Sequence, residues 1–248
     1  MSTANPPPAK RRRSPMVTRP YGGVHADTRR QERRARLLAA GLEVIGTRGF
    51  HLSTVRDVCA HSGLSERYFY ESFKGMGLLF EALYADLHAE SQRRVMAGFV
   101  GASALKADAM QMAESALIAW LHYIKEDARR ARILLIEAVT VNESSLRSTK
   151  AAFQDFASII QAFVQRLYPD LGKLGYETQM MSSVLAGACL QAAKTWMWAD
   201  FQQPVEDVAA HLTVVFRSLH DFYVRETARL VTPPAEAAKP KSRRRAGA

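Results

Sequence analysis

The chain has 248 residues, of which 48% are hydrophobic, as expected for a globular protein with a sizeable core. Because it has two cysteines, a polar start and no apolar run of about 18 residues, we expect a cytoplasmic protein without a disulfide framework, secretory signal or membrane span. The formal net charge of +10 is uneven: residues 1–20 carry +5 and residues 231–248 carry +4, which leaves +1 for residues 21–230.

The two chain ends are rich in proline, alanine and basic residues and lack hydrophobic periodicity. Such segments bury too little apolar surface to offset the entropy lost on ordering, so we predict a disordered arm over residues 1–26 and a disordered tail over residues 231–248. Flexible cationic segments can contact phosphates and release counterions, which adds sequence-independent affinity for nucleic acid. Solubilising tails without a partner are an equally good interpretation.

The first predicted helix runs from about residue 28 to residue 48. Leu38, Leu42 and Ile45 repeat at helical spacing, and Gly49 is placed to cap the end. Four arginines gather near its start: Arg29, Arg30, Arg33 and Arg34. Positive charge at this end opposes the helix dipole, which indicates a negative partner such as a phosphate. A solvated charged turn is the alternative.

Residues 53–73 are predicted to form two short helices joined by a tight turn, which is the shape of a helix-turn-helix. Ser53 is a good N-cap for the first of these helices. Its apolar face consists of Val55, Val58 and Cys59. Gly63 lies at the turn, where glycine tolerates the positive φ that a sharp change of direction needs.

The second short helix has Ser65 as its predicted N-cap. Phe69 and Phe73 lie four residues apart and are assigned to the inward face. The outward face carries Arg67, Tyr68, Tyr70 and Glu71. A helix of this kind can enter a major groove about 12 Å wide. An ordinary helical hairpin explains the glycine and the phenylalanines, but it does not explain the outward tyrosines and arginine.

Seven residues in this region resemble the pattern of the tetracycline-repressor (TetR) family of bacterial regulators: Gly63, Leu64, Ser65, Phe69, Tyr70, Phe73 and Leu79. The resemblance is close over about residues 31–84 and architectural beyond them. It implies an all-α fold, with an N-terminal three-helix helix-turn-helix domain over residues 27–76 and a C-terminal helical ligand-binding and dimerisation domain over residues 77–230. The chain departs from the pattern at Met76, where relatives carry a phosphate-binding lysine, and Lys74 is the candidate substitute.

The resemblance also implies which side chains face DNA. The base-edge candidates are Arg56, Glu66, Arg67 and Tyr68, and the phosphate candidates are Thr54, Ser65, Tyr70, Ser72 and Lys74. Arginine can pair bidentately with guanine and glutamate can accept from cytosine, whereas hydroxyls and helix N-termini suit phosphates. Because the two helix-turn-helix domains of a dimer bind two half-sites, we expect a double-stranded, pseudo-palindromic operator.

Six further helices are predicted from apolar spacing and from breakers such as Pro169 and Pro204. Their approximate ranges are 78–98, 107–126, 127–138, 143–168, 176–200 and 205–230. The segment Gly75-Met76-Gly77 is expected to break the chain before the first of them. No alternation of the strand type and no internal repeat is evident.

The last two of these helices offer a dimerisation surface. The penultimate helix is rich in small residues that allow close approach of another helix: Ser182, Ser183, Ala186, Gly187, Ala188, Cys189, Ala192 and Ala193. The final helix has apolar residues at spacings of three and four: Val208, Leu212, Val215, Phe216, Leu219 and Phe222. Together they predict a homodimer with a four-helix interface, as the resemblance also implies. Intramolecular core is the alternative interpretation of both faces.

An effector pocket between the helices of the body is a further implication of the resemblance. The candidate lining residues are Trp120, Tyr123, Phe153, Phe156, Met180, Met181 and Trp196, with His122 and Gln191 as candidate polar anchors. Because ligand sites are mostly apolar with few polar groups, we expect a small hydrophobic effector. Packing in an ordinary core accounts for the same large side chains.

The sequence shows no catalytic or metal-binding constellation, since its seven histidines lack metal-type spacing and its glycines form no phosphate loop. We therefore expect no cofactor, no membrane partner and no enzymatic activity. The predicted function is a sequence-specific repressor that leaves its operator when the effector binds. Two other classes stay open, a non-specific nucleoid-type protein that uses the basic arms and a helical enzyme or carrier with a coincidental motif. Activation rather than repression is also open.

Overall fold

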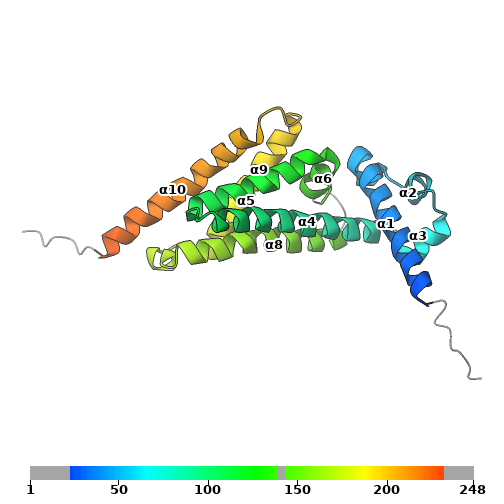
Figure 1. Cartoon of the computed structure of the whole chain (residues 1–248), viewed down its shortest axis with the longest axis horizontal. Coiled ribbons are helices and arrows are strands. Elements are labelled where there is room, and N and C mark those ends of the chain that lie inside the picture. Colours follow the sequence, from blue (N-terminus) through cyan, green and yellow to red (C-terminus); the bar gives the residue numbers. More distant parts are fainter. Residues whose placement is uncertain (1–22, 139–142, 232–248) are drawn as a thin grey trace, which may run out of the picture.

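The computed structural model describes residues 23–138 and 143–231. Within these ranges every regular element is a helix, so the predicted all-α fold is confirmed (Figure 1). The predicted disorder of the chain ends lies outside the described residues, except that the first helix begins at Gly23, inside the predicted arm.

The order of the elements matches the predicted succession of helices, with short helical turns added. They are α1 (Gly23–Arg48), the 3₁₀ turn η1 (Phe50–Leu52), α2 (Val55–Ser62), α3 (Glu66–Ser72), α4 (Met76–Ala104), α5 (Ala109–Glu126), α6 (Ala128–Arg132), the π-helical turn η2 (Ile133–Glu137), α8 (Glu143–Leu167), the 3₁₀ turn η3 (Leu171–Leu174), α9 (Thr178–Trp198) and α10 (Val205–Val231).

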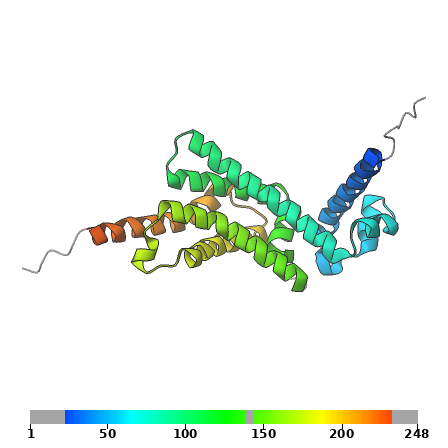
Figure 2. The same cartoon turned by 90° about the horizontal axis from the view of Figure 1, so that it is seen from below.

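A small head of three helices, α1 to α3, lies at one end of a longer helical body (Figures 1 and 2). The head packs around fully buried side chains of its own helices and of the first turns of α4: Leu37, Ile45, Val58, Phe69, Leu79 and Phe80. Helix α4 then runs on into the body, so the two parts share one continuous helix (Figure 2). Its first half belongs to the core of the head.

The body is a bundle of α4, α5, α8, α9 and α10 with its own apolar core. Buried residues of α5, α9 and α10 meet there, among them Trp120, Leu121, Ile124, Cys189, Ala193 and Leu212. A buried hydrogen bond adds to this packing, since the Tyr123 hydroxyl donates to the carbonyl of Leu87 at 3.0 Å and ties α5 to α4. Burial raises the pKa of Tyr123 to about 12, so the phenol stays protonated and keeps its role as a donor.

Helix α6 and the π turn η2 join the two cores. Ile133 and Ala138 are buried in the core of the head, whereas Ala131 and Leu135 are buried in the core of the body. A π turn widens the helix by one residue and is frequent at functional sites. Here it lets neighbouring side chains of one segment face two different cores. The sequence pattern predicted a plain helix over residues 127–138, so the π turn is a new feature.

Several predicted helix boundaries need correction. Ser53 is not the N-cap of α2, because its hydroxyl donates to the Gly49 carbonyl at 2.7 Å, and Thr54 caps the helix instead. Helix α4 begins at Met76, so only Gly75 lies outside it and Gly77 is helical. The ends of the other helices agree with the pattern to within a few residues, apart from the earlier start of α1 and the longer α4.

The two helices predicted to dimerise each present one face to the monomer and one to the outside. Val208 and Leu212 are buried within the body, so the prediction that they lie on an outer surface is wrong. The exposed apolar side chains of α9 and α10 are instead Met180, Val184, Trp198, Val214, Val215, Val224 and Leu230. None of the helices in the described ranges combines the length and apolarity needed to cross a bilayer.

Candidate functional site

The first helix of the helix-turn-helix is fixed by a reciprocal cap. The Thr54 hydroxyl accepts a hydrogen bond from the Asp57 amide at 3.2 Å, and the Asp57 carboxylate accepts from the Thr54 amide at 2.9 Å. Hydrogen bonds from Thr54, with the nearby Arg48 guanidinium, hold the pKa of Asp57 below its usual value. The cap therefore keeps a carboxylate at the end of α2 where the helix dipole favours negative charge.

The turn between α2 and α3 depends on Gly63, whose φ is +65°. This left-handed conformation favours glycine, and it lets the Gly63 amide reach the Cys59 carbonyl as a helix C-cap. Arg36 of α1 donates to the Ser62 carbonyl at 2.6 Å, which satisfies a second orphan carbonyl of α2. The angle of the helix-turn-helix is thus set by its own turn and by α1.

Helix α3 is anchored by Phe69 and Phe73, which are 0% and 4% exposed. The opposite face is open to solvent, with Tyr70 54% exposed and Arg67 extended toward Glu71 at 3.2 Å. Ser65 is the N-cap residue of α3, as predicted, but its hydroxyl makes no capping bond. A short helix held by two aromatic anchors and carrying polar residues outward has the form required to enter a groove.

Two arginines from the middle of α1 brace this helix. The Arg33 guanidinium lies over the Tyr68 ring, 4.7 Å from its centroid, and that of Arg34 lies over Phe73 at 4.3 Å. Arg34 also donates to the Ser72 carbonyl at 3.3 Å. The interpretation of these two arginines as groups that await a phosphate is therefore incomplete, because both position α3.

The nine side chains proposed to face DNA lie together on the outer surface of the head. All are exposed except the half-buried Ser72, and the set is Thr54, Arg56, Ser65, Glu66, Arg67, Tyr68, Tyr70, Ser72 and Lys74. The Thr54 hydroxyl is already engaged by Asp57. Met76 packs against the core of the head, whereas Lys74 projects into solvent just before α4.

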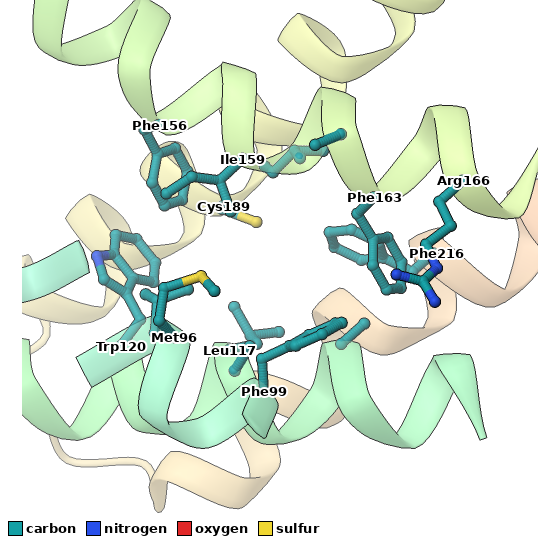
Figure 3. Close-up of a pocket in the computed structure, with 15 residues that line it drawn as sticks. Met96, Phe99, Leu117, Trp120, Phe156, Ile159, Phe163, Arg166, Cys189 and Phe216 are labelled. Carbon is teal, nitrogen blue, oxygen red and sulfur yellow. The ribbon is translucent and has the colours of Figure 1, made fainter. Parts of the chain in front are cut away.

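A second candidate site is a cavity of about 420 Å³ in the body, enclosed by α4, α5, α8, α9 and α10 (Figure 3). Fourteen of the fifteen side chains that line it are apolar or, in the case of Cys189, a thiol: Val95, Met96, Phe99, Ala113, Ala116, Leu117, Trp120, Phe156, Ile159, Ile160, Ala162, Phe163, Cys189 and Phe216. The remaining one is Arg166. The volume lies in the range of ligand pockets.

Only some of the residues predicted to line a pocket lie around this cavity. Trp120 and Phe156 line it and contact each other, with ring centroids 5.4 Å apart. Tyr123 and Trp196 are buried in the core, where their polar atoms are satisfied by Leu87 and Gln203 carbonyls. Helical periodicity alone does not separate such core aromatics from lining ones.

The other predicted pocket residues lie elsewhere. Met180 is 61% exposed on α9, Met181 packs in a third small core, and the side chain of Phe153 lies outside the described residues. The candidate polar anchors are also absent from the lining: His122 faces Glu206 at 3.8 Å, and Gln191 is exposed.

Sequence reasoning missed most of the lining that α8 supplies. Phe156, Ile159, Phe163 and Arg166 recur at spacings of three and four, so they form one stripe along the helix. That spacing was present in the sequence as a signal. Burial raises the pKa of the lining Cys189 thiol to about 12, which makes it a neutral apolar wall and not a nucleophile. Among the described residues no cluster of side chains is arranged to hold a metal ion.

The joint between head and body is held by buried charge. The Glu137 carboxylate, 5% exposed, accepts from the Phe50 amide at 2.9 Å and from Arg132 at 3.0 Å. Arg132 also donates to the Thr47 carbonyl at 3.0 Å. The π turn is thereby fastened to the end of α1 and to η1.

A second ionic contact lies one turn earlier on α6. Arg129 forms ion pairs with Glu43 of α1 and with Asp127, and the hydrogen bond from Arg129 lowers the pKa of Asp127. Between these contacts α1 approaches α6 closely at Gly46, where a Cβ would lie 3.0 Å from the Arg129 Cα. The head is therefore fixed to α6 by both charge and shape.

Comparison with known proteins agrees with this geometry. The family model of bacterial regulatory proteins of the tetR family matches residues 37–83, which contain α2 and α3. The chain therefore carries a DNA-binding domain of the tetR family. The TetR resemblance drawn from the helix-turn-helix residues is thus confirmed, as is the expectation of a regulator that is not an enzyme.

A curated protein and several solved structures are similar to a larger part of the chain. The HTH-type transcriptional activator FasR from Mycolicibacterium smegmatis is 24% identical over 201 residues, which cover 80% of this chain and 88% of FasR. The fatty acid degradation regulator FadR from Bacillus halodurans has a TM-score of 0.64 and 11% identity over 74% of this chain and 93% of its own. FadR from Bacillus subtilis, solved in complex with stearoyl-CoA, has a TM-score of 0.63 and 14% identity over 73% and 96%.

Proposed function

We propose that this regulator is a cytoplasmic homodimeric repressor that binds a pseudo-palindromic operator and leaves it when an apolar effector enters the body. The observation that carries the proposal is the apolar cavity, which lies in a body whose core is joined to the core of the head by α4 and by the segment of α6 and η2. We assign DNA binding to residues 27–76 and effector binding and dimerisation to residues 77–230. The segments 1–26 and 231–248 are the proposed flexible arms.

The π turn supports a route from the cavity to the head. Trp120 and Leu117 line the cavity and belong to the same core as Ala131 and Leu135. An effector that displaces these side chains changes the packing under α6 and η2, and the ion pairs of Arg129 and Glu137 pass that change to α1. For release from DNA, the effector only has to bind one of two arrangements of this joint more tightly than the other.

The DNA contacts are proposed as the sequence indicated them. Exposure supports Arg56, Glu66, Arg67 and Tyr68 as base-edge contacts and Ser65, Tyr70 and Lys74 as phosphate contacts, and the half-buried Ser72 is retained as a phosphate contact. Thr54 keeps its place in the set through its position at the N-terminus of α2, where backbone amides suit a phosphate. The apolar residues exposed on α9 and α10 support dimerisation through these two helices.

A gel shift with the DNA upstream of the protein's own gene, against random competitor, tests the proposal. A regulator of this kind binds one fragment selectively, whereas a nucleoid-type protein binds all fragments alike and a carrier binds none. Activation is a second candidate mode, since the relative FasR is described as a transcriptional activator. A promoter fusion to a reporter distinguishes the two modes, because deletion of the gene raises expression for a repressor and lowers it for an activator.

Replacing Arg67 by alanine is expected to weaken operator binding by about 1–3 kcal/mol and to relax specificity at one base step. Its side chain is 85% exposed on α3 and pairs with Glu71. Affinities for the operator and for single-base variants are the measurement. Arg93→Ala is the matched control, since Arg93 also pairs with a glutamate on an exposed helix face but lies on α4 in the body. Equal weakening on every DNA would instead make Arg67 a phosphate contact.

A further inference from the structure

The cavity is apolar along its whole length except at one end. Among the lining residues that the structure describes, Arg166 is the single charged one, and Figure 3 shows it leaving α8 at the end opposite Trp120. Trp120, which is 4% exposed, lies at the other end in contact with Phe156. Arg166 is exposed, so its guanidinium lies where the cavity opens to water. The cavity therefore has one end lined by aromatic side chains and one end that carries a positive charge.

Arg166 has no structural task that accounts for its charge. Among the residues that the structure describes it forms no ion pair, and Asp170, the nearest acidic residue one turn further along the chain, is engaged by Lys173 at 2.7 Å. Its stem lies beside Phe163 and Phe216, which also line the cavity (Figure 3). An arginine in this setting recognises a carboxylate or phosphate through paired N–H donors.

We propose that the cavity binds a single-chain anionic amphiphile, with the head group on Arg166 and the chain directed inward to Trp120. This inference rests on the proposed function, because it names the chemical class of the apolar effector. A neutral apolar molecule leaves Arg166 unused, and a cationic one is repelled by it. A chain with a negative head satisfies both ends of the cavity at once.

The spacing of the lining sets the length of the chain. Phe156 and Arg166 are ten residues apart on α8, which corresponds to about 15 Å along the helix axis. A saturated chain advances about 1.3 Å per carbon when its C–C bonds are about 1.5 Å long. The cavity therefore accommodates about twelve carbons, and a much longer chain has to displace either its head from Arg166 or the Trp120 side chain.

Calorimetric titration of the full chain with dodecanoate and dodecanol, both below their micelle concentrations, tests the head group. Because an exposed ion pair contributes up to about 1 kcal/mol, we expect dodecanoate to bind about fivefold more tightly than dodecanol. This preference should disappear in Arg166→Gln and persist in Arg217→Gln. Arg217 is the matched control, since it is exposed and adjoins Phe216 in the chain but does not line the cavity.

Two further titrations define the source of the anionic group and the length of the ligand's alkyl chain. Titration with dodecanoyl-CoA beside dodecanoate shows whether the phosphates of coenzyme A or a free carboxylate form the better head group. The compound that binds more tightly must lose its higher affinity in Arg166→Gln. Affinity should rise about two- to fourfold per added methylene up to about twelve carbons and then level or fall. A preference that Arg166→Gln leaves intact, or equal binding of acid and alcohol, overturns the inference.

The gel shift without ligand keeps this result separate from the proposed function. If the chain selects its operator but binds neither dodecanoate nor its thioester, the inference on the effector class fails and the DNA-binding function stands. If an amphiphile binds with the expected loss in Arg166→Gln but no fragment is selected, the proposed function fails and the amphiphile site stands.

Discussion

Replacing Glu137 by alanine is expected to lower the free energy of unfolding by about 3 kcal/mol and to weaken operator binding. The carboxylate is 5% exposed and receives hydrogen bonds from the Phe50 amide at 2.9 Å and from Arg132 at 3.0 Å. Truncation leaves the part-buried Phe50 amide and the Arg132 Nε–H without their acceptor, which costs more than the bonds themselves contribute. Denaturant unfolding gives the stability, and a gel shift gives the affinity for DNA.

Two variants make this result specific. Glu137→Gln keeps an acceptor for the Phe50 amide but loses the charge opposite Arg132, so an intermediate loss is expected. Glu206→Ala removes a carboxylate that is 67% exposed and lies 3.8 Å from His122, so its effect should stay within about 0.5 kcal/mol. If Glu137→Ala and Glu206→Ala were equally stable, the buried carboxylate would not fasten the head to the body.

Local sequence patterns were enough to predict the head. Gly63 marked its turn, while Phe69 and Phe73 marked the buried side of α3, and each of these signals lies within a few residues of the feature that it sets. The wrong assignment of Ser53 as the N-cap of α2 also has a local cause. Ser53 and Thr54 are both good caps, and only the 3₁₀ turn before them, which engages Ser53, decides between the two.

The cavity could be predicted only in part, because core and lining residues share one periodicity. Trp120 and Tyr123 lie one turn apart on α5, yet the first lines the cavity and the second donates a buried hydrogen bond to α4. The same ambiguity affected α10, where Val208 and Leu212 face the monomer core and Val214 faces outward. A helix shows which of its residues share a face, but the neighbouring helices decide what that face meets.

The contacts that join the head to the body could not be predicted from local sequence patterns. Glu43 meets Arg129, and Phe50 meets Glu137, across more than eighty residues of chain. The π turn that turns Ile133 toward one core and Leu135 toward the other also has no simple signature in a single sequence. These contacts exist only once both cores have formed, so they are features of the tertiary structure that joins the head to the body.

Replacing Gly46 by leucine is expected to lower the free energy of unfolding by about 2–3 kcal/mol, although leucine is the better helix former by nearly 1 kcal/mol. A Cβ at this position would lie 3.0 Å from the Arg129 Cα and 3.2 Å from its Cγ, and still closer to its Cβ. Since the backbone of α6 is involved, the clash cannot be relieved by rotating a flexible side chain. Helix α6 has to move away from α1, which also strains the ion pair of Arg129 with Glu43.

Gly101→Leu is the matched control for this variant, because Gly101 also lies in a helix but has no atom within 4 Å of an added Cβ. Its stability should be unchanged or higher by up to about 1 kcal/mol. The decisive measurement is the affinity for operator with and without effector. If the joint couples the two sites, Gly46→Leu narrows the difference between these affinities and Gly101→Leu preserves it. A Gly46→Leu protein that loses stability but keeps the full effector response would show that the close approach serves the fold alone.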